Sequence, residues 1–200
     1  MKKRNFNDGG TLVMTPPATA NWINIFKSSF HKDDPKKVLK FSIELLFDKD
    51  AKNVEDSKSL KPLVEAWEVA KKKEWGDNVP RKCRSPFRDG DNEEDFEGDH
   101  YKGKWVVKFS TNDNPKFPAP TVYKKLPGEE QGYLKDPKEL YSGCKVRVTG
   151  TAGAYTTGQN GVKFYLENVC KVAEGEPIEG VAQSHDARDD FGDIEETDEF

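Results

Sequence analysis

Four short segments of this 200-residue chain alternate apolar and polar residues with a period of two. In residues 38–47 the two faces carry different side chains: Leu39, Phe41, Ile43, Leu45 and Phe47 against Lys40, Ser42 and Glu44. Similar alternation runs through residues 104–110, 144–150 and 162–172. Successive side chains of a strand point to opposite faces, so the pattern predicts four half-buried β-strands.

One helix is predicted between the first two of these strands. Ser59 is expected to be its N-cap, and Pro62 lies in its first turn. Gly76 is expected to end it, so that the helix spans residues 59–75.

The other segments are expected to connect these elements. Asn-Gly at 160–161 predicts a turn between the last two strands, within a loop longer than two residues. Residues 1–14 are interpreted as a loose basic arm, residues 80–98 as a loop and residues 122–123 as part of a short strand. Residues 21–30 are interpreted as an anchoring segment of undefined type, because three aromatic residues recur there at helical spacing: Trp22, Phe26 and Phe30.

This order of elements is typical of a mainly β fold. Short antiparallel strands with one inserted helix fit a five-stranded Greek-key barrel of the OB type, and they also fit a small sandwich. We expect the barrel domain to span residues 1–180. Residues 181–200 are expected to form a flexible tail, because they bury too little apolar surface to offset the entropy of ordering.

The charge of the chain is divided unevenly. Residues 186–200 hold eight acids and one arginine, a charge of −7, which leaves +3 for residues 1–185 of a chain whose net charge is −4. A mildly basic body joined to a strongly acidic tail suggests that the body binds a polyanion and that the tail imitates one. The tail residues expected to bind partners are Asp189, Asp190, Asp193, Glu195, Glu196, Asp198, Glu199 and Phe200.

Composition argues against secretion and membrane insertion. The three cysteines show no short spacing, which favours a reducing compartment over a disulfide framework. No apolar run follows the basic N-terminus, and none approaches the ~20 residues that a membrane span needs.

The sequence offers no enzyme signature, and we predict neither a catalytic residue nor a cofactor. His31, His100 and His185 are scattered, and no phosphate-binding loop or metalloprotease motif is present. The acidic run 89–99 does not fit a calcium loop, because Glu94 and Phe96 fall where that loop needs glycine. A metal-dependent nuclease using these carboxylates stays open as a minor alternative, although no pair of ligands stands out.

Binding of single-stranded nucleic acid is better supported, since it needs cations for phosphates and exposed rings for bases. Strand alternation places Trp105 and Phe109 in the core and directs other side chains outward. The predicted nucleic-acid-binding residues are Lys40, Trp75, Tyr101, Lys104, Lys108, Tyr123, Lys145, Arg147, Tyr155, Lys163 and Tyr165.

Several motifs, taken in order, resemble the tailed-bacteriophage single-stranded DNA-binding proteins. They are Thr-Pro-Pro-Ala-Thr-Ala at 15–20, Tyr-Ser-Gly-Cys at 141–144, Ala-Tyr at 154–155, the strand residues 161–166 with Val169, and the acidic tail ending in phenylalanine. The resemblance implies an OB-fold barrel and single-stranded DNA binding during phage replication, recombination and repair, in the cytoplasm of the infected bacterium. It also implies a tail that recruits replication proteins such as a polymerase or a helicase/primase, with Phe200 at the matching last position.

Besides the minor nuclease alternative, two readings from different classes therefore remain. The first is a non-enzymatic single-stranded DNA-binding protein whose tail competes with DNA for the basic face. A homodimer is compatible with this reading. The second is an OB-type protein-interaction module without a role on DNA.

Overall fold

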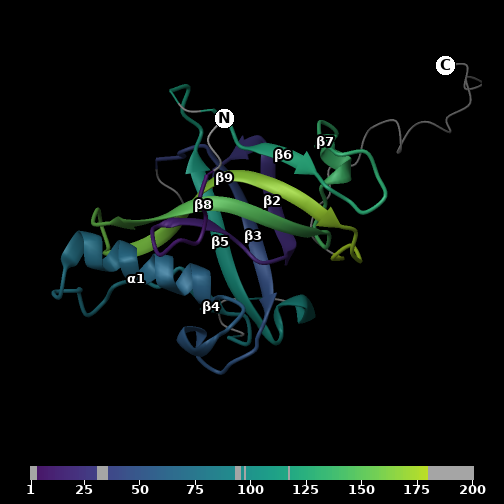
Figure 1. The fold of residues 1–200 in the computed structure, drawn as a ribbon. Helices are drawn as coiled ribbons and strands as arrows, with labels where there is room; N and C mark the ends of the chain where they lie inside the picture. The colour runs from purple at the N-terminus through teal and green to yellow at the C-terminus, as the bar shows by residue number, and fades with distance from the viewer. Residues whose placement is uncertain (1–3, 31–35, 93–95, 97, 117, 180–200) are drawn as a thin grey trace, which may run out of the picture.

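Five strands close a barrel in the computed structural model, which describes residues 4–30, 36–92, 96, 98–116 and 118–179. They are β2 (Ala18–Ser29), β3 (Lys40–Asp48), β5 (Lys104–Asn112), β8 (Lys145–Tyr155) and β9 (Gly161–Ala173). Around the ring β2 pairs with β3, β3 with β5, β5 with β9, β9 with β8, and β8 with β2 (Figure 1). The β5–β9 contact is parallel and the other four are antiparallel. This arrangement confirms the predicted mainly β fold of the OB type.

Shorter elements extend this ring in the described part of the chain. β1 (Leu12–Met14) pairs with β8, and β4 (Phe87–Asp89) pairs with β5. β6 (Thr121–Lys124) pairs with β9, and β7 (Gly132–Tyr133) pairs with β6. Single 3₁₀ turns occupy Val54–Asp56 (η1), Asp99–Tyr101 (η2) and Pro137–Glu139 (η3).

Two interpretations of the N-terminal half were wrong, and one segment of undefined type now has a defined structure. The supposed arm contains β1, and the supposed loop over 80–98 contains β4. The segment 21–30 lies mostly in β2, a strand that alternation did not reveal. Two register shifts in β2 add residues that have no partner on β3 and change which positions face the core. Ala18 and Ala20 are buried before the first shift and Ile25 after it, so the strand shows no continuous alternation.

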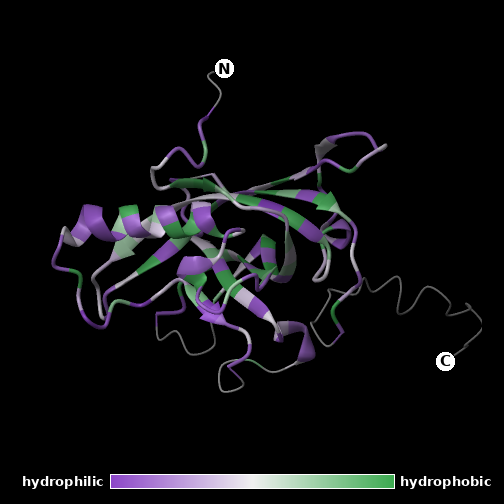
Figure 2. Ribbon diagram, turned by 60° about the horizontal axis from the view of Figure 1, so that its bottom comes forward, coloured by the Kyte–Doolittle hydropathy of each residue, from purple (hydrophilic) through white to green (hydrophobic). Residues whose placement is uncertain are grey.

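The predicted helix is α1 (Lys61–Trp75), and it starts two residues later than expected. Ser59 is not the N-cap; Leu60 holds that position, and its amide donates to Ser57 Oγ at 3.1 Å. Gly76 ends the helix as predicted, because its φ of 56° suits glycine and its amide donates to the Lys72 carbonyl. Hydrophobic and hydrophilic residues alternate along α1 and along the strands (Figure 2). Among the described residues, no helix is long and apolar enough to cross a membrane.

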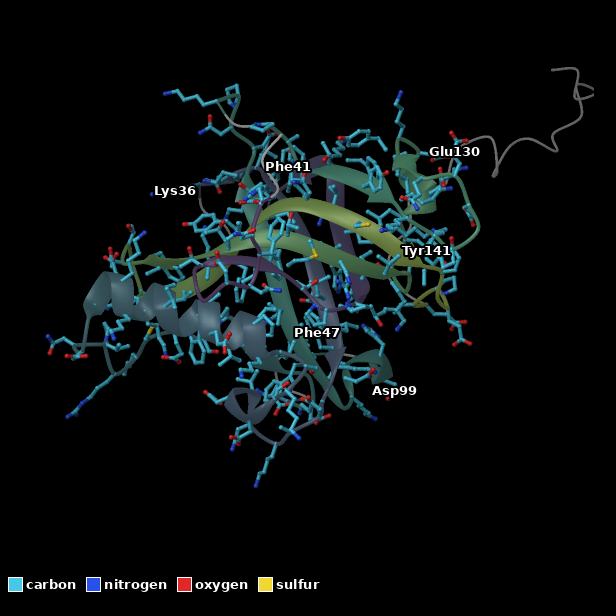
Figure 3. All side chains as sticks on the ribbon, in the orientation of Figure 1. Lys36, Phe41, Phe47, Asp99, Glu130 and Tyr141 are labelled. Carbon is cyan, nitrogen blue, oxygen red and sulfur yellow. The ribbon has the colours of Figure 1, made fainter. Side chains whose placement is uncertain are left out.

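The core is built around aromatic contacts that join the barrel to α1. Phe109 and Phe164 stack with their ring centroids 4.9 Å apart, and Phe87 meets Phe164 edge-on at 5.9 Å. Trp67 of α1 then meets Phe87 at 5.5 Å. Trp105 is buried as predicted. Figure 3 labels two further buried rings of this core, those of Phe41 and Phe47 at the two ends of β3.

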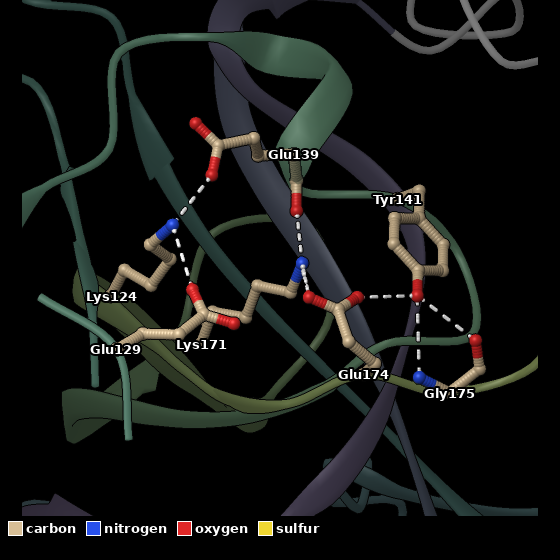
Figure 4. Close-up of polar contacts among 7 residues, drawn as sticks. All are labelled: Lys124, Glu129, Glu139, Tyr141, Lys171, Glu174 and Gly175. Atoms are coloured by element: carbon tan, nitrogen blue, oxygen red, sulfur yellow. Dashed lines mark hydrogen bonds and ion pairs between the residues drawn. The ribbon is translucent and has the colours of Figure 1, made fainter. Parts of the chain in front are cut away.

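A group of polar contacts holds the C-terminal end of β9 (Figure 4). The Tyr141 hydroxyl donates to Glu174 at 2.7 Å and accepts the amide of Gly175 at 3.2 Å. Lys171, which is 2% exposed, donates to the Glu139 carbonyl at 2.7 Å and pairs with Glu174 at the same distance. A buried ammonium group needs such partners, so these contacts hold the end of β9 against the chain that follows η3.

A second polar cluster lies under the outer face of β3. Glu44 was predicted to face solvent, but it is 6% exposed because η2 covers it. Its carboxylate accepts from Asn21 (3.1 Å), Tyr101 (3.0 Å) and Arg88 (2.5 Å). Burial, and then the charge of Glu44, raise the pKa of Tyr101 to about 12. A desolvated carboxylate is tolerated here because several donors and one cation surround it.

We predict that Phe164→Ala lowers the free energy of unfolding by about 3–5 kcal/mol, because it removes a fully buried ring and leaves a cavity beside Phe109 and Phe87. Urea unfolding followed by circular dichroism measures the change. Val79→Ala, at a side chain 39% exposed, is the control and should stay within about 0.5 kcal/mol of the parent protein. Equal losses in the two variants would contradict the central role of this ring.

The buried Tyr101 predicts a specific dependence of stability on alkaline pH. An unfolded tyrosine releases its proton near pH ~10, whereas folded Tyr101 holds it to about 12. The unfolded state therefore holds fewer protons between these two values, and the free energy of unfolding should fall as pH rises through this window. Comparing urea unfolding of the parent and of Tyr101→Phe from pH 9 to 11.5 tests this. The parent should lose on the order of 2 kcal/mol more than the variant, and parallel profiles would contradict the assignment.

Candidate nucleic-acid interface

The β8–β9 pair presents one long outer face. Paired residues of neighbouring strands direct their side chains to the same side of a sheet. From the hairpin end inward, the pairs on this face are Tyr155–Gly161, Gly153–Lys163, Thr151–Tyr165, Thr149–Asn168 and Arg147–Cys170. The 11 residues of β8 span about 36 Å. Five of the predicted binding residues, Lys145 among them, thus lie along a single ribbon.

Two tyrosines on this ribbon lie over glycines. A Cβ atom on Gly153 would come within 2.6 Å of the Tyr165 ring, and one on Gly161 within 2.4 Å of the Tyr155 hydroxyl. Lys163 Nζ lies 4.3 Å from the centroid of the Tyr165 ring, which is 37% exposed. The glycines leave space for aromatic rings against the backbone, with a cation beside one of them.

A row of side chains continues this face across β6 and β7. Arg147 pairs with Cys170, Cys170 with Tyr123 and Tyr123 with Tyr133, so all four point to the same side. The two tyrosine rings meet edge-on, with centroids 5.6 Å apart, and Tyr133 is 72% exposed. Burial raises the pKa of the Cys170 thiol, and the nearby charges of Lys125 and Arg147 oppose that rise. Cations and exposed rings are therefore neighbours here too.

Three lysines gather where β3, β5 and β9 meet. The pairing of Phe109 with Phe164 brings Lys108 of β5 beside Lys163 of β9. Desolvation and the charge of Lys40 lower the pKa of Lys163. Desolvation also lowers the pKa of Lys108; Glu44 opposes this change, whereas Arg88 and Lys40 add to it. Ammonium groups that are partly desolvated and repel one another favour an anion at their surface.

Three predicted residues do not contribute to this face. Tyr101 is 5% exposed and hydrogen-bonded in the Glu44 cluster, so its ring cannot stack on a base. Trp75 packs against the core at the end of α1. Lys104 pairs with Asp48 across β3 and β5.

Lys145 does face outward, where its ammonium group donates to Thr19 Oγ1 at 2.7 Å. The predicted tail residues lie outside the described residues.

Among the described residues, sequence reasoning missed four exposed rings as binding candidates. They are Trp22 (48% exposed) and Phe26 (38%) of β2, Phe30 (47%) just after β2, and Tyr133 of β7. Alternation gives no signal for a strand as short as β7 or for an irregular one such as β2. In the described part of the acidic run, Asp89 and Asp91 pair with Lys49. The described residues contain no group of three or more His, Cys, Asp or Glu side chains that could hold a metal ion.

Solved structures of phage proteins share this fold. A single-stranded DNA-binding protein from bacteriophage Enc34 in complex with ssDNA superposes with a TM-score of 0.64 and 20% identity, over 84% of this chain and 89% of that one. A second structure of the Enc34 protein gives 0.62 and 20%, over 88% and 89%. The single-stranded DNA-binding protein gp2.5 of bacteriophage T7 gives 0.59 and 13%, over 87% and 98%. Among curated proteins, none matches this sequence.

A family model covers nearly the whole chain. It describes the ssDNA-binding protein of Enterobacter phage Enc34 and matches residues 11–200, which include the barrel, the β8–β9 ribbon and the acidic segment. The chain therefore belongs to the Enc34 family of phage single-stranded DNA-binding proteins.

Proposed function

We propose that this protein binds single-stranded DNA with little sequence preference, along the outer face of β8 and β9. The observation that carries the proposal is the pair of tyrosines lying over glycines, with Lys163 beside the ring of Tyr165. Every base has a π-face, so stacking on such rings contributes roughly 1–3 kcal/mol per base without reading sequence. The lysines at the β3–β5–β9 junction would hold phosphates, and affinity should fall steeply with salt.

Family membership supports this proposal, because the Enc34 relative is described in complex with ssDNA. We further propose a non-enzymatic role in phage DNA replication, recombination and repair. In that role the protein would cover exposed single strands while other proteins act on the DNA.

For residues 186–200 we propose two linked roles. Their charge of −7 is opposite to that of the lysine junction, so this segment would compete with DNA for the basic face at low salt. When DNA displaces it, its carboxylates and Phe200 would become available to replication partners.

We predict that Tyr165→Ala weakens binding of a fluorescent dT oligonucleotide about 5- to 150-fold, the equivalent of one lost stacking contact. Fluorescence anisotropy at a single stated salt concentration measures it. Gly153→Ala is the matched variant: it keeps the tyrosine but pushes its ring from the strand, and it should weaken binding in the same direction.

Val79→Ala is the control and should bind like the parent protein. If the parent protein itself does not bind the oligonucleotide at low salt, with or without the acidic segment, the proposal fails and the protein-interaction module becomes the better reading.

Deletion of residues 186–200 should tighten binding of the dT oligonucleotide at low salt and have little effect at high salt, where the competition is screened. The control replaces the eight acids with their amides and keeps the length, and it should behave like the deletion. Unchanged affinity at low salt in both variants would reject the competition. Pull-down of the phage polymerase or helicase/primase with and without Phe200 tests recruitment separately.

A further inference from the structure

Trp22 occupies a backbone position that usually belongs to glycine. Asn21 pairs with Glu44 and Asn24 pairs with Ser42, so Trp22 and Ile23 together oppose the single residue Ile43 in a β-bulge. The φ angle of Trp22 is 42°, in the left-handed region. A bulky residue is rare there, since its Cβ crowds the backbone, and such strain concentrates at functional sites.

The indole of Trp22 is held from beneath although its ring is exposed. Its Nε1 donates to the Tyr101 hydroxyl at 3.0 Å. That hydroxyl also accepts from Asn21 at 3.0 Å and donates to Glu44 at 3.0 Å, so its one proton and both lone pairs are used. The buried cluster therefore fixes the direction of a side chain that remains 48% exposed.

The bulge lies at one end of a row that leads to the ribbon face. Asn21 pairs with Glu44 on β3, and Glu44 pairs with Lys108 on β5. The adjacent pair, Phe109 with Phe164, brings Lys108 beside Lys163 of β9, whose ammonium group lies over the Tyr165 ring. A strand of nucleic acid that contacts these lysines would thus have an exposed ring at each end of the row.

We propose that Trp22 is a base-stacking residue and that Tyr101 is its positioning residue. This inference rests on the proposed binding of single-stranded DNA and extends it across the barrel from β9 to β2. Structure alone does not require tryptophan at this position, because glycine would adopt the same backbone angle without strain. A large ring that is strained, exposed and hydrogen-bonded at its edge is suited to receive the face of a base.

The test measures binding of a fluorescent dT oligonucleotide together with urea unfolding. Trp22→Gly should weaken binding about 5- to 150-fold, the equivalent of one stacking contact. It should unfold near the parent midpoint, because relief of the left-handed strain offsets loss of a half-exposed ring. Trp22→Phe keeps a ring but loses the N–H donor. Its affinity for the oligonucleotide should lie between those of the parent protein and of Trp22→Gly. In the parent, DNA should quench indole emission, and Trp22→Phe should lose most of that quenching.

A double-mutant cycle tests the positioning role. Tyr101→Phe alone should weaken binding, whereas adding it to Trp22→Gly should cause no further loss, because no indole remains to be positioned. Additive losses would reject the role of Tyr101.

Parent-level affinity and quenching in the Trp22 variants would reject the stacking role and leave the proposed function intact. Absence of binding by the parent protein would reject both.

Discussion

The barrel depends on the contact between Phe109 and Phe164. It lies where β5 and β9 run parallel, at one of the two seams that join the first three barrel strands to the last two. Both rings are fully buried, and Gly150 leaves room for Phe109, since a Cβ there would lie 3.0 Å from its ring. The same seam sets Lys108 beside Lys163, so the contact that closes the core also assembles the basic junction on the surface.

The basic surface lies above a buried negative charge. Glu44 is held by Asn21, Tyr101 and Arg88, and its charge favours the charged form of Lys108, whereas Arg88 and Lys40 disfavour it. Without it, the desolvated Lys108 would lose its proton more readily. The cluster therefore offsets, at Lys108, part of the repulsion from Arg88 and Lys40. One carboxylate thus serves both the packing of η2 and the electrostatics of the outer face.

The regular strands could be predicted from sequence, and the irregular parts could not. Alternation identified β3, β5, β8 and β9 because each keeps one face in the core over most of its length. Alternation did not predict β2, because its bulges change which positions are exposed along the strand. The burial of Tyr101 could not be predicted either, because its partners Asn21 and Glu44 are 80 and 57 residues away in sequence. Lys104 and Trp75 looked available for the same reason: their partners, Asp48 and the barrel core, come from other elements.

The glycines beneath the ribbon tyrosines have a consequence for the entropy of recognition. A side chain that swings freely must lose rotamer freedom when a ligand orders it, and that loss weakens the complex. The rings of Tyr155 and Tyr165 already rest against the strand where Gly161 and Gly153 have no side chain. Glycine in a strand costs backbone entropy when the chain folds. The two tyrosine side chains are therefore ordered when the chain folds, and their binding to a ligand costs little further rotamer entropy.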